Sequence, residues 1–126
     1  MFDNFKLQKN FLEFLKIYKD RPIQNNESGI RIEHAFALFS ILKKINPLYV
    51  IESGVFKGMS TWIIEKALPK CKIYCIEPNF NKIKYYSKNA EYYKKDITLL
   101  RWDKLKKNKT LISVSYTHLR AHETDR

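Results

Sequence analysis

Two glutamates in the middle of the chain have the residue type and the spacing to form a ligand site. Glu52 follows the short apolar run 49–51, and Glu77 follows the apolar run Lys72–Ile76. A carboxylate in such a place accepts hydrogen bonds from hydroxyl groups or pairs with an ammonium group. The two positions therefore predict recognition of a polar small molecule, provided that the fold brings them together.

A glycine turn between the two glutamates offers backbone groups for the same ligand. Gly54 and Gly58 lack side chains, so they can adopt positive φ and let a ligand approach the backbone closely. Ser60 or Thr61 can cap the helix that is expected to follow. The start of that helix has unpaired N–H groups and the positive end of the helix dipole, which suit a carboxylate or a phosphate.

The elements that must position these residues are a strand, a turn, a helix and a second strand. The run 49–51 has no polar alternation, which is typical of a parallel strand covered on both faces. The spacing predicts a helix over 60–68 and a second strand over Lys72–Ile76. In an open parallel sheet, ligands bind outside the carboxyl ends of the strands, and an acidic residue about 20 positions beyond the glycine turn bonds ribose hydroxyls. Glu77 lies 23 positions after Gly54 and fits that role.

The pattern Glu52-x-Gly54-x-x-x-Gly58-x-Ser60 resembles the first motif of class I S-adenosylmethionine-dependent methyltransferases. It is particularly similar to the subset with an E-x-G-V-x-x-G-x-S-T turn, found among small-molecule and sugar-modifying enzymes of bacteria. A dinucleotide-binding fingerprint would instead read G-x-G-x-x-G. The resemblance covers about residues 30–113.

The resemblance implies S-adenosyl-L-methionine as the cofactor. It implies that Glu77 holds the ribose hydroxyls, that the backbone of the glycine turn lines the methionine moiety, and that Glu52 lies near its ammonium group. The plain alternatives are a solvated strand end for Glu52 and an ordinary turn residue for Glu77. The cofactor-binding residues predicted in this way are Glu52, Gly54, Gly58, Ser60, Thr61, Glu77 and Asp96.

Three of these residues contact the two ends of the cofactor in this interpretation. Ser60 and Thr61 would meet its carboxylate at the start of the helix, and Asp96 would accept a hydrogen bond from the adenine amino group. A simple turn residue is the alternative for Asp96. No catalytic base is identified, because in the family it usually lies beyond the fourth strand.

The fold class that follows is α/β and Rossmann-like. We expect about three to four strands of a seven-stranded methyltransferase fold, preceded by two helices. Further strands are expected at 91–94 and from Thr110 onward, with a helix over 80–88 between the second and third strands. The expected organisation is an amino-terminal helix and loop over 1–29, a truncated cofactor-binding domain over 30–113 and a tail over 114–126.

The tail is interpreted as non-native. The segment VSYTHLRAHET, which begins at Val114, resembles the conceptual translation of a transposase sequencing adapter, and Asp125 and Arg126 would come from the adjoining index bases. Such a scar is excluded from fold reasoning. His118, His122 and Glu123 superficially suggest a zinc site, but within this interpretation they have no selected role and no metal is expected.

The net charge of +11 raises the alternative of nucleic-acid binding. The excess is lysine, and the chain is also rich in residues with AT-rich codons, so genome composition is a sufficient explanation. The lysines are scattered, apart from a run at 104–109 that is read as a solvated loop. No nucleic-acid partner is therefore expected.

The remaining features concern location and packing. A helix is expected from about Asn10; its interleaved aromatics and lysines allow a membrane-surface role, but packing on its own domain is favoured, so no membrane partner is expected. His34 is assigned to the packed apolar face of a helix over 30–45. Cys71 and Cys75 are about 13 Å apart along an extended strand, too far for a disulfide, and indicate a reducing cytoplasm.

The sequence thus predicts methyl transfer to a small-molecule or sugar-type acceptor, with this chain carrying the cofactor-binding half. Two alternatives remain open at this point. One is a nucleotide-binding Rossmann protein of the NAD type that transfers no methyl group. The other is a truncated fragment that is inactive alone.

Overall fold

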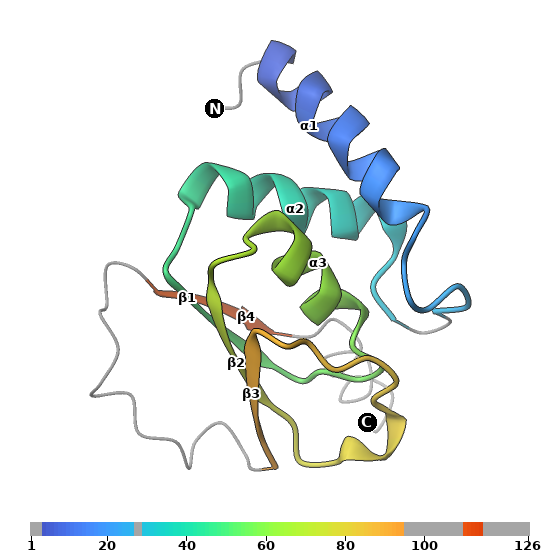
Figure 1. Cartoon of the computed structure of the whole chain (residues 1–126), viewed down its shortest axis with the longest axis vertical. Coiled ribbons are helices and arrows are strands. Elements are labelled where there is room, and N and C mark those ends of the chain that lie inside the picture. Colours follow the sequence, from blue (N-terminus) through green and yellow to red (C-terminus); the bar gives the residue numbers. More distant parts are fainter. Residues whose placement is uncertain (1–3, 27–28, 95–109, 115–126) are drawn as a thin grey trace, which may run out of the picture.

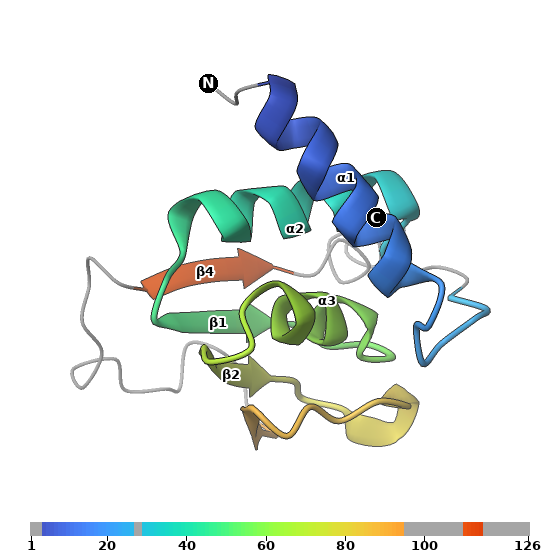
Figure 2. The same ribbon diagram turned by 45° about the horizontal axis from the view of Figure 1, so that its top comes forward.

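The computed structural model describes residues 4–26, 29–94 and 110–114, in which a four-stranded parallel sheet carries helices on one face (Figures 1 and 2). The sheet order is β3-β2-β1-β4. In chain order the elements are α1 (Asn4–Tyr18), α2 (Ile32–Ile45), β1 (Tyr49–Ser53), α3 (Met59–Ala67), β2 (Lys72–Ile76), the 3-10 helix η1 (Phe80–Lys82), β3 (Ala90–Tyr93) and β4 (Thr110–Val114). This arrangement confirms the predicted α/β class with two helices ahead of a parallel sheet.

β1 pairs with β2 on one side and with β4 on the other. Its last residue, Ser53, lies opposite Ile76 of β2 on one side and Val114 of β4 on the other. The carboxyl ends of three strands therefore meet at one edge, as the sequence predicted. The chain passes from β1 to β2 on one side and places β4 on the other, so the strand order reverses beside β1, where ligands bind in open α/β sheets.

The hydrophobic core lies between this sheet and the two helices α2 and α3. Val50 of β1 and Ile73 of β2 are fully buried on the helix side, and Phe39 and Ile63 meet them from the helices. Burial of each such side chain contributes about 1.5–3 kcal/mol. This core fixes β1, α3 and β2 as one unit around the glycine turn.

The opposite face of the sheet carries a row of tyrosines. Tyr49, Tyr74 and Tyr93 come from three neighbouring strands, with ring centroids 6.2 and 6.4 Å apart. The helices α1, α2 and α3 lie on the other face (Figures 1 and 2). Cross-strand aromatic pairs of this kind stabilise the pairing of neighbouring strands.

α1 begins at Asn4, earlier than the predicted start at Asn10. It packs on α2 through Phe14, whose ring lies 5.5 Å from that of Phe36 and 5.6 Å from that of Phe39. Phe14 is the one fully enclosed residue of this helix, and Phe5 is 76% exposed. The expected packing of α1 on its own domain thus involves only one edge of the helix.

The buried face of α2 differs from the predicted one. The helix buries Ala35, Phe39 and Leu42, while His34 is exposed and Ile41 is 41% exposed. The assignment of His34 to the packed face is therefore wrong. α2 carries two overlapping apolar stripes, and the aromatic contacts of Phe39 with α1 select the one that faces inward.

The helix predicted over 80–88 is also absent. Only η1 forms, and it is capped by the Asn79 side chain, which accepts a hydrogen bond from the Asn81 N–H at 2.9 Å. Residues 83–87, here called the strap, are extended and run beside the start of α3 to β3 (Figure 1). The Lys84 and Tyr85 N–H groups both donate to the Lys57 carbonyl, at 2.8 and 3.0 Å, so tertiary contacts replace the hydrogen bonds of a helix.

Candidate functional site

The turn between β1 and α3 has the backbone conformation that its glycines predicted. Gly54 has φ of 85° and Gly58 has φ of 102°, in the region that favours glycine. Between them Phe56 also has a positive φ, of 54°, which a bulky side chain rarely adopts. No pattern in the sequence predicts this third position. Such strain is maintained only where surrounding contacts determine it.

Gly58 is required by the protein's own backbone. A Cβ atom at this position would lie 2.4 Å from the Tyr85 carbonyl oxygen of the strap. The sequence predicted close approach of a ligand at the glycines, and the group that approaches Gly58 here is the strap. The strap therefore forms one wall of the turn.

Glu77 reaches the glycine turn from the end of β2. Its Oε1 accepts hydrogen bonds from the Val55 N–H at 2.8 Å and from the Phe56 N–H at 3.4 Å. Its Oε2 accepts from the Asn79 N–H at 3.1 Å. The carboxylate is half-buried and held by the backbone on both sides. The structure thus joins the two parts of the predicted site, Glu77 and the turn, at the carboxyl edge of the sheet.

Glu52 lies on the helix side of the sheet, beneath the start of α3. It is 1% exposed, and its carboxyl group contacts the hydroxyls of Ser60 and Thr61. The Cys75 thiol lies opposite it in register, with Sγ 3.7 Å from Oε1. Glu52, Ser60 and Thr61 were predicted separately as ligand contacts, and the structure links them to one another instead.

The predicted capping of α3 by Ser60 or Thr61 is wrong. The N-cap of α3 is Gly58, without a side-chain cap bond, and Ser60 and Thr61 lie within the first turn. Their hydroxyls turn toward Glu52 because that buried carboxyl group needs hydrogen-bond partners. The first turn of α3 is thereby tied to β1.

Enclosure changes the acidity of Glu52. Burial raises its pKa to about 7; the hydrogen bonds of Ser60, Thr61 and Cys75 lower the pKa, and the charge of Glu77 adds to the rise. The carboxyl group therefore takes up a proton near neutral pH. An ammonium contact for Glu52 stays a prediction, and it would have to be made through the layer of Ser60 and Thr61.

Several residues that the sequence analysis singled out lie outside the described part of the chain. Asp96 lies outside the described residues, as do the tail residues His118, His122 and Glu123. The loop before α2 reaches the turn, because the Lys57 ammonium donates to the Asn25 carbonyl at 3.2 Å. Within the described ranges no group of three potential metal-ligating side chains occurs.

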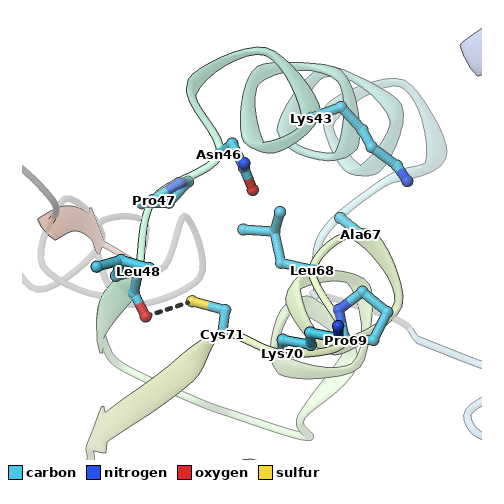
Figure 3. A pocket seen from close by; sticks show the side chains of 9 residues that line it. All are labelled: Lys43, Asn46, Pro47, Leu48, Ala67, Leu68, Pro69, Lys70 and Cys71. Carbon is cyan, nitrogen blue, oxygen red and sulfur yellow. Dashed lines mark hydrogen bonds between the residues drawn. The ribbon is translucent and has the colours of Figure 1, made fainter.

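A cavity of about 320 Å³ lies at the opposite edge of the sheet (Figure 3). It is lined by the segments before β1 and β2 and by the ends of α2 and α3, including Lys43, Leu48, Leu68 and Cys71. The Cys71 thiol donates to the Leu48 carbonyl at 3.3 Å, and burial raises the pKa of this thiol to about 11. A protonated thiol is a poor nucleophile, so this cavity offers no evident chemistry.

No protein-family model matches this chain, and no curated protein matches it. Solved structures do. The structure described as "cmcI-N160 SAH" matches with a TM-score of 0.56 and 13% identity, over 76% of this chain and 52% of that one. The O-methyltransferase from Bacillus cereus in complex with SAH matches with a TM-score of 0.38 and 7% identity, over 99% and 50%. This chain spans about half the length of both, and the first match supports the predicted α/β, Rossmann-like fold.

Proposed function

We propose that this chain forms the cofactor-binding half of an S-adenosylmethionine-dependent methyltransferase. The observation that carries the proposal is the Glu77 carboxylate, held on the glycine turn at the carboxyl edge of the sheet. The fold match supports it, as does SAH in the names of both matched structures. The order of Glu52, Gly54 and Gly58 adds the motif resemblance.

Glu77 has the geometry to hold ribose hydroxyls. An ionised carboxylate has about four acceptor positions. Three backbone N–H groups donate hydrogen bonds to Glu77, and the Phe56 N–H is the most distant of them, at 3.4 Å. One acceptor position is left, and a hydroxyl can replace the long contact from Phe56. A nucleoside with two neighbouring hydroxyls would therefore find its partner already oriented.

Bound S-adenosylmethionine would supply an electrophilic methyl group for an in-line displacement. The part of the chemistry that this chain can perform is orientation: Glu77 fixes the ribose, and the strained turn at 54–58 fixes the backbone beside it. Holding reactants in an attack geometry accounts for much of the rate of such a reaction. We propose a small-molecule or sugar-type acceptor, because the E-x-G-V-x-x-G-x-S-T turn is similar to that of enzymes acting on them.

A nicotinamide dinucleotide is the competing ligand. The turn does not favour it, because the chain has Gly54-x-x-x-Gly58 where the dinucleotide fingerprint has G-x-G-x-x-G, so the glycine spacing that wraps a pyrophosphate is missing. Titration of the chain with S-adenosylhomocysteine and with NAD, each by calorimetry, separates the two ligands. Preference for NAD, or binding of neither compound, would overturn the proposal.

Replacement of Glu77 tests the observation on which the proposal rests. We expect Glu77→Ala to weaken S-adenosylhomocysteine binding by about 1–3 kcal/mol, because charge-assisted hydrogen bonds are lost. Glu77→Gln keeps one acceptor oxygen and should lose less. The matched control is Glu91→Gln, which changes an exposed glutamate on β3 away from the turn. Equal affinity of the wild type and Glu77→Ala would contradict the assigned role.

We also propose a cellular compartment and a class of partner for this protein. Cys71 and Cys75 are both free and buried, which suits a reducing compartment such as the cytoplasm. No described helix is long and apolar enough to cross a membrane. We propose no nucleic-acid partner, since the fold match and Glu77 both indicate a small ligand.

A further inference from the structure

The strap is fastened to α3 by one buried carboxylate. Glu65 is 7% exposed, and its Oε1 accepts hydrogen bonds from the Tyr85 hydroxyl at 2.6 Å and from the Ser87 hydroxyl at 2.7 Å. The nearest cation is Lys66, whose ammonium lies 3.9 Å from Oε2 and whose side chain is 45% exposed. The hydroxyls are therefore the close partners of this carboxylate.

A buried carboxylate is costly unless its hydrogen bonds are satisfied. An apolar residue at position 65 would pack against the core without that cost. Glu65 gains two specific bonds in exchange, and both go to the strap. The proton of Tyr85 is held there, because burial and the hydrogen bond to Glu65 both raise the pKa of the phenol.

The same stretch of strap supports the glycine turn. The Lys84 and Tyr85 N–H groups hold the Lys57 carbonyl, and the Tyr85 carbonyl lies against Gly58. Ser87 fixes the far end, since its N–H donates to the Tyr92 hydroxyl at 2.7 Å on β3. The strap is therefore held at three places: at the turn, at Glu65 of α3 and at Tyr92 of β3.

We propose that Glu65 is a positioning residue for the glycine turn, acting through Tyr85 and Ser87. The helix α3 sets the distance between the turn and the Glu65 contact in this arrangement. It begins at the turn, and Glu65 binds the strap two helical turns later. Loss of the Glu65 bonds leaves the strap held by its backbone bonds to Lys57 and Tyr92, so the Tyr85 carbonyl is less firmly positioned against Gly58. The link to cofactor affinity rests on the proposed function, whereas the link to the order of the turn does not.

The test uses four variants of the whole chain and one control. Glu65→Ala removes both bonds, while Tyr85→Phe and Ser87→Ala each remove one hydroxyl. Lys66→Ala is the matched control, because it changes the adjacent, exposed residue of α3 and only the long ion pair. Amide hydrogen exchange at Lys84 and Tyr85 is measured with Asn46 as the reference, whose N–H donates to the Leu42 carbonyl at 2.8 Å in α2.

We expect Glu65→Ala to speed exchange at Lys84 and Tyr85 by about tenfold relative to Asn46, and each hydroxyl variant to do so by a few fold. A merely stabilising role would speed all three amides together. Glu65→Gln keeps an acceptor oxygen and should restore slow exchange. Should Glu65→Ala fail to fold, Tyr85→Phe and Ser87→Ala decide the matter. Unchanged exchange in both hydroxyl variants would overturn the proposal.

Calorimetric titration with S-adenosylhomocysteine forms the second arm. Glu65→Ala should weaken its binding by about tenfold, with Lys66→Ala at the wild-type affinity. Wild-type affinity in Glu65→Ala would overturn the coupling of this residue to the site. Absence of binding by the wild type would instead count against the proposed function, and the exchange arm would still decide the role of Glu65.

Discussion

Gly58→Ala is expected to destabilise the fold by about 2–6 kcal/mol. Two costs combine. The φ of 102° is strained for a residue with a Cβ, which costs about 1–3 kcal/mol. The new methyl group would also lie 2.4 Å from the Tyr85 carbonyl, and a backbone neighbour cannot rotate away, so overpacking adds about 1–3 kcal/mol.

Urea unfolding followed by circular dichroism measures this cost, and Asn46→Ala is the matched control. Asn46 also has a positive φ, of 51°, at the exposed end of α2, and it already carries a side chain. Its replacement by alanine should cost no more than about 1 kcal/mol. If Gly58→Ala unfolds within 1 kcal/mol of the wild type, the strap does not hold the turn closed in solution.

Glu52→Gln is expected to stabilise the protein above neutral pH and to have little effect in acid. The pKa of Glu52 is raised by burial to about 7 from an ordinary value of 4.5, so the folded state binds its proton more tightly than the unfolded state does. The resulting stability is fully present below pH 4.5, falls as the pH rises, and is lost once the pH passes about 7. The loss is on the order of 3 kcal/mol.

Unfolding free energies of the wild type and Glu52→Gln, measured from pH 4 to pH 8, check this expectation. The difference between the two proteins should grow across the window, because glutamine does not titrate and other groups cancel. Glu91→Gln is the control with the opposite sign: the Tyr93 hydroxyl and Lys72 lower the pKa of Glu91, so the stability that Glu91 contributes is present above pH 4.5 and is lost only as the pH falls below that value. A constant difference for Glu52→Gln would show that the carboxyl group is not enclosed.

The sequence predicted the β1, α3 and β2 unit well, for a local reason. Short apolar runs, two glycines and a proline mark its elements, and these signals do not depend on distant contacts. β1 extends two residues past the predicted 49–51 to Ser53, because polar Glu52 was read as the end of the strand. Tertiary hydrogen bonds made that polar residue part of the interior.

The position of Glu52 could have been found from strand periodicity. Alternate residues of a strand point to the same face, so Glu52 shares a face with Val50, which packs under the helices. Glu77 instead follows the last residue of β2, and its carboxylate accepts a hydrogen bond from the Val55 N–H in the turn. Its contact with a ligand stays a prediction. The two glutamates differ because Glu52 lies within its strand, whereas Glu77 lies just after the end of its strand.

The helix predicted over 80–88 failed for a reason that no local pattern records. The residues that keep the strap extended, Lys57 and Glu65, lie on the other side of β2 in the sequence. The segment itself has ordinary helical composition, and its backbone donors are taken by Lys57. Asp96 remains a prediction, because it lies outside the described residues.

The register of β1 also has a consequence for the order of assembly during synthesis. The loop that joins β1 to β2 contains α3 alone, so these strands can pair early. The pairing of β1 with β4 requires all of residues 54–109 to be made first. Closing the shorter loop costs less chain entropy, so the half-site of turn, α3 and β2 can form on the emerging chain first. Until β4 is made, the backbone of β1 has an open edge. During this interval a chaperone can protect the edge, or the edge can pair prematurely with another chain.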